Sequence, residues 1–120
     1  MKEKINFKSK FKLFSDHWSP KIVARLNDYE FKLVKLKNKF VWHQHMDTDE
    51  AFIVIEGSMG IEFSDRVVKL ESGEMLVVKK GEMHRPFAKN ECKVLIIEPK
   101  DVTNTGEIVN NLTAKNDIWI

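Results

Sequence analysis

The chain has 120 residues, of which 42% are hydrophobic and 32% charged, and its formal net charge is +2. This length predicts one domain with a modest core, and the composition excludes an intrinsically disordered chain. The small net charge argues against nucleic acid as a partner, and no apolar stretch is long enough to span a membrane. Because Cys92 is the single cysteine and no signal-peptide pattern is visible, we expect a cytoplasmic protein without internal disulfides.

The N-terminal extension, residues 1–21, carries two overlapping patterns. Phe7, Phe11, Phe14 and Trp18 follow a helical spacing, whereas the alternation of apolar residues with lysines is typical of a strand. We therefore expect a short N-terminal strand or helix that packs outside the main body.

The remainder of the chain has an all-β pattern. Turn residues separate short apolar stretches, and no long helical pattern interrupts them, so we expect a β-sandwich or β-barrel. The predicted strands are residues 22–26, 31–36, 40–45, 51–56, 59–63, 66–70, 75–78 and 92–98. Residues 99–120 read as a loop and tail that ends in a short strand at 118–120.

Two histidines alternate on the predicted strand 40–45. Residues two apart on a strand point to the same face, so the imidazoles of His43 and His45 can converge on one ion. Glu50 opens the next strand, and a hairpin would return its carboxylate to the histidines. His84 offers a third nitrogen donor farther along the chain. Imidazoles with one carboxylate suit a divalent transition metal, although paired histidines on a strand also occur without one.

The acidic turn between the two strands offers other carboxylates. Asp47 and Asp49 are alternatives to Glu50 as metal ligands. Since turn residues usually point to solvent, we favour Glu50.

Two segments have a distinctive spacing of histidine, glutamate and glycine. The first runs His43-Gln44-His45, four residues, Glu50, six residues, Gly57; the second runs Gly73, five residues, Lys79-Lys80-Gly81, two residues, His84. In this order they resemble the two motifs of the cupin superfamily of small barrels. The resemblance covers about residues 22–98 and departs at three turn positions, where Asn38 stands near the leading glycine, Lys79 replaces a proline and Ala88 replaces an asparagine.

The resemblance implies a fold and a metal site. It implies a double-stranded β-helix, or jelly-roll, barrel in a single domain over 1–120, with the conserved barrel at about 22–98 and a tail at 99–120. It further implies that one divalent transition metal (iron, manganese, nickel or zinc) is bound by His43, His45, Glu50 and His84.

The resemblance also suggests a function without naming a reaction. We expect a metal-dependent enzyme, a dioxygenase or an isomerase, that acts on a small organic molecule. The alternatives are a non-catalytic module that binds or senses a small molecule, and a structural metal in an oligomeric barrel; we expect a homodimer. Candidate substrate-pocket residues are Phe52, Val54, Met75, Arg85 and Phe87.

Overall fold

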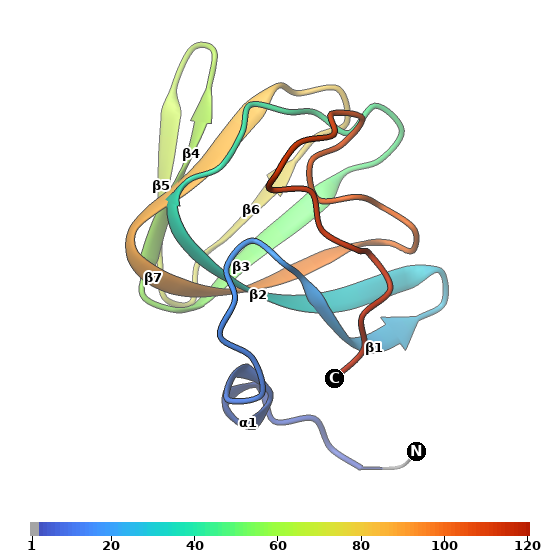
Figure 1. The fold of residues 1–120 in the computed structure, drawn as a ribbon. Coiled ribbons are helices and arrows are strands. Elements are labelled where there is room, and N and C mark those ends of the chain that lie inside the picture. Colours follow the sequence, from blue (N-terminus) through green and yellow to red (C-terminus); the bar gives the residue numbers. More distant parts are fainter. Residues whose placement is uncertain (1–2) are drawn as a thin grey trace.

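Seven strands and one short helix make up the described part of the chain, residues 3–120 of a computed structural model (Figure 1). The elements in chain order are α1 (Phe7–Phe11), β1 (Lys21–Leu26), β2 (Tyr29–Lys39), β3 (Glu50–Glu56), β4 (Ser58–Phe63), β5 (Val67–Glu71), β6 (Met75–Val78) and β7 (His84–Pro99).

Strand β7 joins the two halves of the fold. All strand pairs are antiparallel, and the main path of the sheet has the order β1-β2-β7-β3-β6, with β4 paired to both β5 and β7. The C-terminal half of β7 lies between β2 and β3, and its N-terminal half pairs with β4. The register with β2 shifts between Leu36 and Asn38, opposite residues 89–91, and β7 curves strongly along its length (Figure 1). The sheet closes into the jelly-roll barrel, which confirms the predicted fold class.

The core follows from the two-residue period of the strands. Even-numbered residues of β2, β3 and β7 point into the barrel, where the buried cluster includes Val34, Phe52, Val54, Val94 and Ile96. The opposite face of the same strands is also apolar in part and forms a second buried cluster outside the barrel.

The N-terminal segment is a helix, so the helical alternative was the correct one. The side chain of Asn6 caps α1 by accepting a hydrogen bond from the Ser9 N–H at 3.0 Å. Phe11 is buried against the outer face of the sheet, beside Leu33 and Leu95. Among residues 3–120, no helix is long and apolar enough to cross a membrane.

The prediction of a regular strand over 40–45 was wrong. Only His43 pairs there, in an isolated bridge to His84. Asn38 adopts a positive φ of 68°, and β2 ends one residue later. A conformation that normally favours glycine is thus taken by asparagine, which tolerates it better than other residues do. The chain then turns into the barrel instead of continuing along its edge.

The predicted strand 92–98 is the second half of a longer one. Residues 84–88 continue the same strand, and Pro86, which has no N–H to donate, is accommodated within it. The tail makes one bridge, between Trp119 and Ile22, at the place where a short strand was expected.

We expect the packing of Phe11 against the sheet to hold α1 on the barrel. Phe11→Ala should lower the free energy of unfolding by about 3 kcal/mol, because it removes a fully buried ring and leaves a cavity. Leu13→Ala is the matched control, since Leu13 is 63% exposed and should change stability by no more than about 0.5 kcal/mol. Chemical denaturation measures both; equal effects would contradict the proposed docking role of Phe11.

Candidate metal centre

Four side chains from three segments meet inside the barrel. His43 and His45 come from the connection between β2 and β3, Glu50 begins β3 and His84 begins β7. One ligand atom from each lies within 4.8 Å of the others, and all four residues are buried.

Backbone hydrogen bonds hold these segments in place. The N–H of His43 donates to the carbonyl of His84 at 3.0 Å, and the N–H of His84 donates back at 2.9 Å. The N–H of Gly81, which has a positive φ of 78°, donates to the His45 carbonyl at 2.8 Å. The bridge substitutes for the regular strand that the sequence predicted and still brings the histidines together.

Two of the imidazoles have a defined tautomer. Nδ1 of His43 lies 2.9 Å from the Val41 carbonyl, and Nδ1 of His84 lies 2.8 Å from the Glu82 carbonyl. Because a carbonyl can only accept, each Nδ1 carries the proton and each Nε2 keeps its lone pair. Metal-ligating histidines are commonly oriented by such a hydrogen bond from the other ring nitrogen.

Several atoms of the group lack partners in the described protein. Nε2 of His45, Nε2 of His84 and Oε1 of Glu50 are buried without a hydrogen bond from any residue of 3–120. Oε1 of Glu50 is 3.4 Å from Nε2 of His45 and 3.6 Å from Nε2 of His84. Unpartnered buried polar atoms are costly, and one divalent ion would satisfy all of them. The residues present therefore fit a transition metal.

The electrostatics of the group keep the donors in their metal-binding forms. Burial lowers the pKa of His43 to about 4, and the neighbouring His84 adds to the effect. Burial alone would raise the pKa of Glu50, but the close approach of the His45 and His84 imidazoles outweighs burial and holds that pKa well below its usual range. At neutral pH the site thus contains a neutral His43 and an ionised Glu50.

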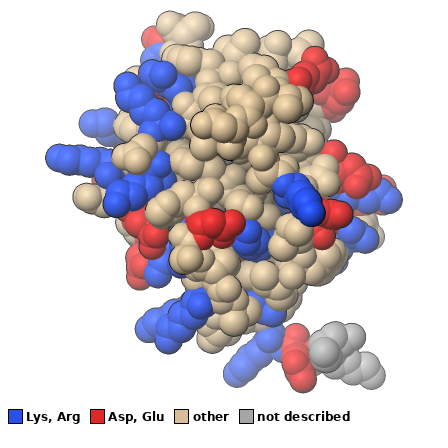
Figure 2. All heavy atoms as spheres, viewed as in Figure 1, with Lys and Arg blue, Asp and Glu red and all other residues tan. Residues whose placement is uncertain are grey.

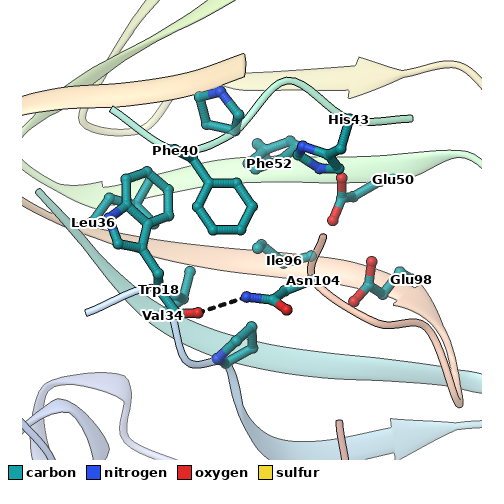
Figure 3. A pocket seen from close by; sticks show the side chains of 12 residues that line it. Trp18, Val34, Leu36, Phe40, His43, Glu50, Phe52, Ile96, Glu98 and Asn104 are labelled. Atoms are coloured by element: carbon teal, nitrogen blue, oxygen red, sulfur yellow. Dashed lines mark hydrogen bonds between the residues drawn. The ribbon is translucent and has the colours of Figure 1, made fainter. Parts of the chain in front are cut away.

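A cavity of about 30 Å³ adjoins the group. Trp18 and Phe40, whose rings stack 4.5 Å apart, form one apolar wall. Figure 3 shows the lining side chains, which are Trp18, Pro20, Val34, Leu36, Phe40, His43, Glu50, Phe52, Pro86, Ile96, Glu98 and Asn104. His43 and Glu50 of the buried group therefore face a mostly apolar space next to the site.

A second buried carboxyl group, which sequence reasoning missed, lies in this cavity. Glu98 accepts a hydrogen bond from Lys32 Nζ at 2.9 Å, and Lys32 lies 3.8 Å from Glu30, which in turn binds Arg25. Burial and the nearby Glu50 raise the pKa of Glu98 well above its usual value, against the effect of Lys32. Strand parity could have identified it, since Glu98 shares its face with the inward-pointing Val94 and Ile96.

Of the five residues predicted to line the pocket, Phe52 lines the cavity. Val54 is fully buried in the barrel core without reaching the cavity, and Met75 is 58% exposed on β6. Phe87 is half-buried on the outer side of the barrel, against the backbone of Gly60.

Arg85 points away from the cavity. Its Nη2 lies 3.1 Å from Oε2 of Glu62, and its guanidinium lies 5.1 Å from the ring centre of Trp42. The structure therefore does not bring Arg85 to the metal group.

The alternative carboxylates also lie elsewhere. Asp47 is exposed, and Oδ1 of Asp49 accepts a hydrogen bond from the Lys80 N–H at 2.9 Å. The acidic turn is thus hydrogen-bonded, through Asp49, to the loop that precedes β7. Neither aspartate belongs to the group of four.

The C-terminal segment covers the cavity. Asn104 reaches its lining, and Gly106, with a positive φ of 67°, packs on the backbone of Gln44, the residue between His43 and His45. A Cβ at position 106 would lie 2.3 Å from the Gln44 carbonyl oxygen, so this close approach requires glycine. The segment crosses the front of the barrel in Figure 1, and Figure 2 shows that face as largely uncharged, with charges toward its margins.

Proteins of known sequence and structure are similar to this chain. The family model described as "Cupin domain" matches residues 32–98. A crystal structure of a cupin-2 domain containing protein from Shewanella frigidimarina is 58% identical and has a TM-score of 0.78, over 79% of this chain and 93% of that one. Protein NMB1881 from Neisseria meningitidis is 36% identical with a TM-score of 0.75, over 81% and 99% of the two chains.

A curated sequence is also similar. The uncharacterized protein YdbB of Bacillus subtilis is 36% identical over 79 residues, which cover 65% of this chain and 70% of that protein. The family model spans more than half of the chain, and its match agrees with the two motifs, the barrel and the buried histidine–glutamate group. The protein therefore belongs to the cupin family.

Proposed function

We propose that this cupin binds one divalent transition metal and acts on a small organic molecule, by oxygenation or isomerisation. The observation that carries the proposal is the buried set of unpartnered donor atoms, His45 Nε2, His84 Nε2 and Glu50 Oε1, beside a small apolar cavity. His43 completes the ligand set.

The four protein ligands leave coordination positions open for a substrate. Four protein ligands leave one or two positions open on an ion that prefers five or six, as catalytic sites require. Iron, manganese, nickel or zinc held there would supply Lewis acidity to a ligand oxygen. The protein's part is to keep His43 neutral, to keep Glu50 ionised and to exclude water with the Trp18–Phe40 wall.

The cavity supports a small substrate. About 30 Å³ holds only a few atoms, since a single water needs about 10–15 Å³ by the same kind of measure. Phe52, Ile96 and Leu36 contribute apolar walls, which suit the carbon skeleton of such a molecule.

We propose further that the protein is a cytoplasmic homodimer that pairs through the outer face of its sheet. Phe31, Ile97, Ala51 and Val77 lie side by side across β2, β7, β3 and β6, and Val77 is partly exposed. The single buried cysteine, whose pKa burial raises to about 11, is in keeping with a reducing compartment.

Sedimentation equilibrium of wild type and Val77→Lys tests the dimer. The variant should shift to monomer, and a dimer that does not shift would mean that the interface lies elsewhere.

The metal proposal is tested by elemental analysis of untagged protein purified without chelators. Wild type should contain about one equivalent of metal, and His45→Ala should contain almost none, because a ligand is lost. Asp49→Ala is the matched control and should keep near-normal metal, since Asp49 binds the Lys80 backbone instead. A normal metal content in His45→Ala would contradict the site assignment. Equal losses of metal in Asp49→Ala and Glu50→Ala would mean that the wrong carboxylate was chosen as the ligand.

The identity of the bound metal directs the search for a reaction. Iron or manganese supports oxygenation, which is tested by substrate-dependent oxygen consumption in air and its absence under argon. Zinc supports isomerisation, which is followed by proton exchange with deuterated water.

The low pKa of His43 predicts acid sensitivity of the metal-free protein. The folded pKa is about 4 and the unfolded one about 6.5, so between these values the unfolded chain binds more protons and stability falls as the pH falls. From pH 7 to pH 4.5 the loss should be about 2 kcal/mol from this residue alone. Urea denaturation at both pH values measures it, with His43→Asn as the control. A decline of the same size in His43→Asn would show that His43 is not its source.

A further inference from the structure

The cavity has four polar lining residues, and three of them are already engaged. His43 and Glu50 belong to the metal group. Asn104 donates from Nδ2 to the carbonyls of Trp18 at 2.8 Å and Leu112 at 2.9 Å, and its Oδ1 accepts from the Ala114 N–H at 2.9 Å. Asn104 therefore serves to fix the covering segment and has no amide proton left for a ligand.

Glu98 is the fourth polar residue, and it has a free atom. The residue is 3% exposed, and its Oε2 is buried without a hydrogen-bond partner among residues 3–120. Oε1 is fixed by Lys32 Nζ at 2.9 Å. Since Lys32 occupies one oxygen, the other is left to interact with the neighbouring Glu50 or with a molecule in the cavity.

The position of Glu98 relative to the metal group limits what it can bind. Figure 3 shows the carboxyl groups of Glu50 and Glu98 turned toward one another at the same end of the cavity. The two carboxyl groups are near enough to shift each other's pKa. A molecule with one oxygen at the metal group and another at Glu98 should therefore carry the two oxygens close together, as on adjacent carbons. No lysine or arginine lines the cavity, so its side chains offer no cation to a carboxylate or phosphate.

We propose that Glu98 is a ligand-binding residue, and that its Oε2 forms a hydrogen bond with the second oxygen of a small uncharged α-hydroxycarbonyl or vicinal diol compound. The proposal rests on the metal function proposed above, because the first oxygen of the compound is placed at the metal group. It gives Glu98 a role in substrate choice that is separate from holding the ion.

Hydroxyacetone and acetone are the matched probes. They share a carbonyl group, and only hydroxyacetone has the neighbouring hydroxyl. Zinc-loaded, ¹⁵N-labelled protein is titrated with each, and the indole N–H of Trp18 and the side-chain amide of Asn104 report binding in the cavity. Wild type should bind hydroxyacetone about tenfold more tightly than acetone, the effect of one good hydrogen bond.

The variant that tests the role is Glu98→Leu, which should bind the two probes about equally while keeping its zinc. Glu98→Leu takes from the buried Lys32 its nearest carboxylate and could prevent folding, so Lys32→Met/Glu98→Leu removes both partners together and should give the same result. Glu98→Gln retains a hydrogen-bonding group and should preserve more of the preference. An unchanged preference in a folded leucine variant, or no preference in wild type, would overturn the proposal.

Zinc content of the same samples separates the two proposals. Stoichiometric zinc with no dependence on Glu98 would leave the metal function standing and remove the role of Glu98. A preference for hydroxyacetone that depends on Glu98 in a protein that takes up no zinc would refute the metal function and the placement of the first oxygen at the metal. It would leave only the hydrogen bond of Glu98.

Discussion

Strand β7 carries the backbone hydrogen bonds on which both the barrel and the site depend. Along its sixteen residues it pairs with β2, β3 and β4. The remaining strands β1, β6 and β5 each pair with one of these three. Its register is strongly specified, because a slip of one residue would turn every inward side chain outward. His84 at one end and Glu98 at the other both point inward, and the curvature of β7 brings both ends to Glu50.

The polar interior is a second consequence of this arrangement. Lys32 on β2 and Glu98 on β7 form an ion pair beside the buried histidine–glutamate group, and most other side chains within the barrel are aliphatic or aromatic. Buried charges are costly unless they are paired, and replacing such a pair by apolar residues often costs nothing in stability. The ion pair of Lys32 and Glu98 is therefore better explained by the fixed position that it gives to the Glu98 carboxyl group than by a gain in folding stability.

Much of the fold could be predicted from residue alternation and turn residues. The strands near 51–56, 59–63 and 75–78 are confirmed within a residue or two, because each is bounded by residues that favour turns. The segment 40–45 was misread, since alternation is local and cannot show that the chain leaves the sheet after Asn38. The length of β7 was also hidden, because the polar residues 89–91 interrupt its apolar pattern where it bends.

The site was only partly visible in the sequence. The spacing of His43, His45 and Glu50 reflects a local turn. His84 was named as a possible donor far along the chain, and only the motif spacing linked it to the other three. Glu98 escaped because it ends an apolar stretch, where a glutamate normally lies at the surface. Its meaning depends on the pairing of β7 with β2, which no local pattern reveals.

The C-terminus occupies one edge of the sheet. The N–H of Ile22 on the edge strand β1 donates to the Ile118 carbonyl, the N–H of Ile120 donates to the Ile22 carbonyl, and Lys10 Nζ binds the Ile120 carbonyl. Unpaired edge strands invite other chains to add to them. Residues 118–120 therefore cover the backbone groups of Ile22, which another chain would otherwise be able to pair with. At the other end of the strand order lies β6, which has four residues and is followed by Lys79 and Lys80. Loss of residues 118–120 would affect solubility before it affected the barrel.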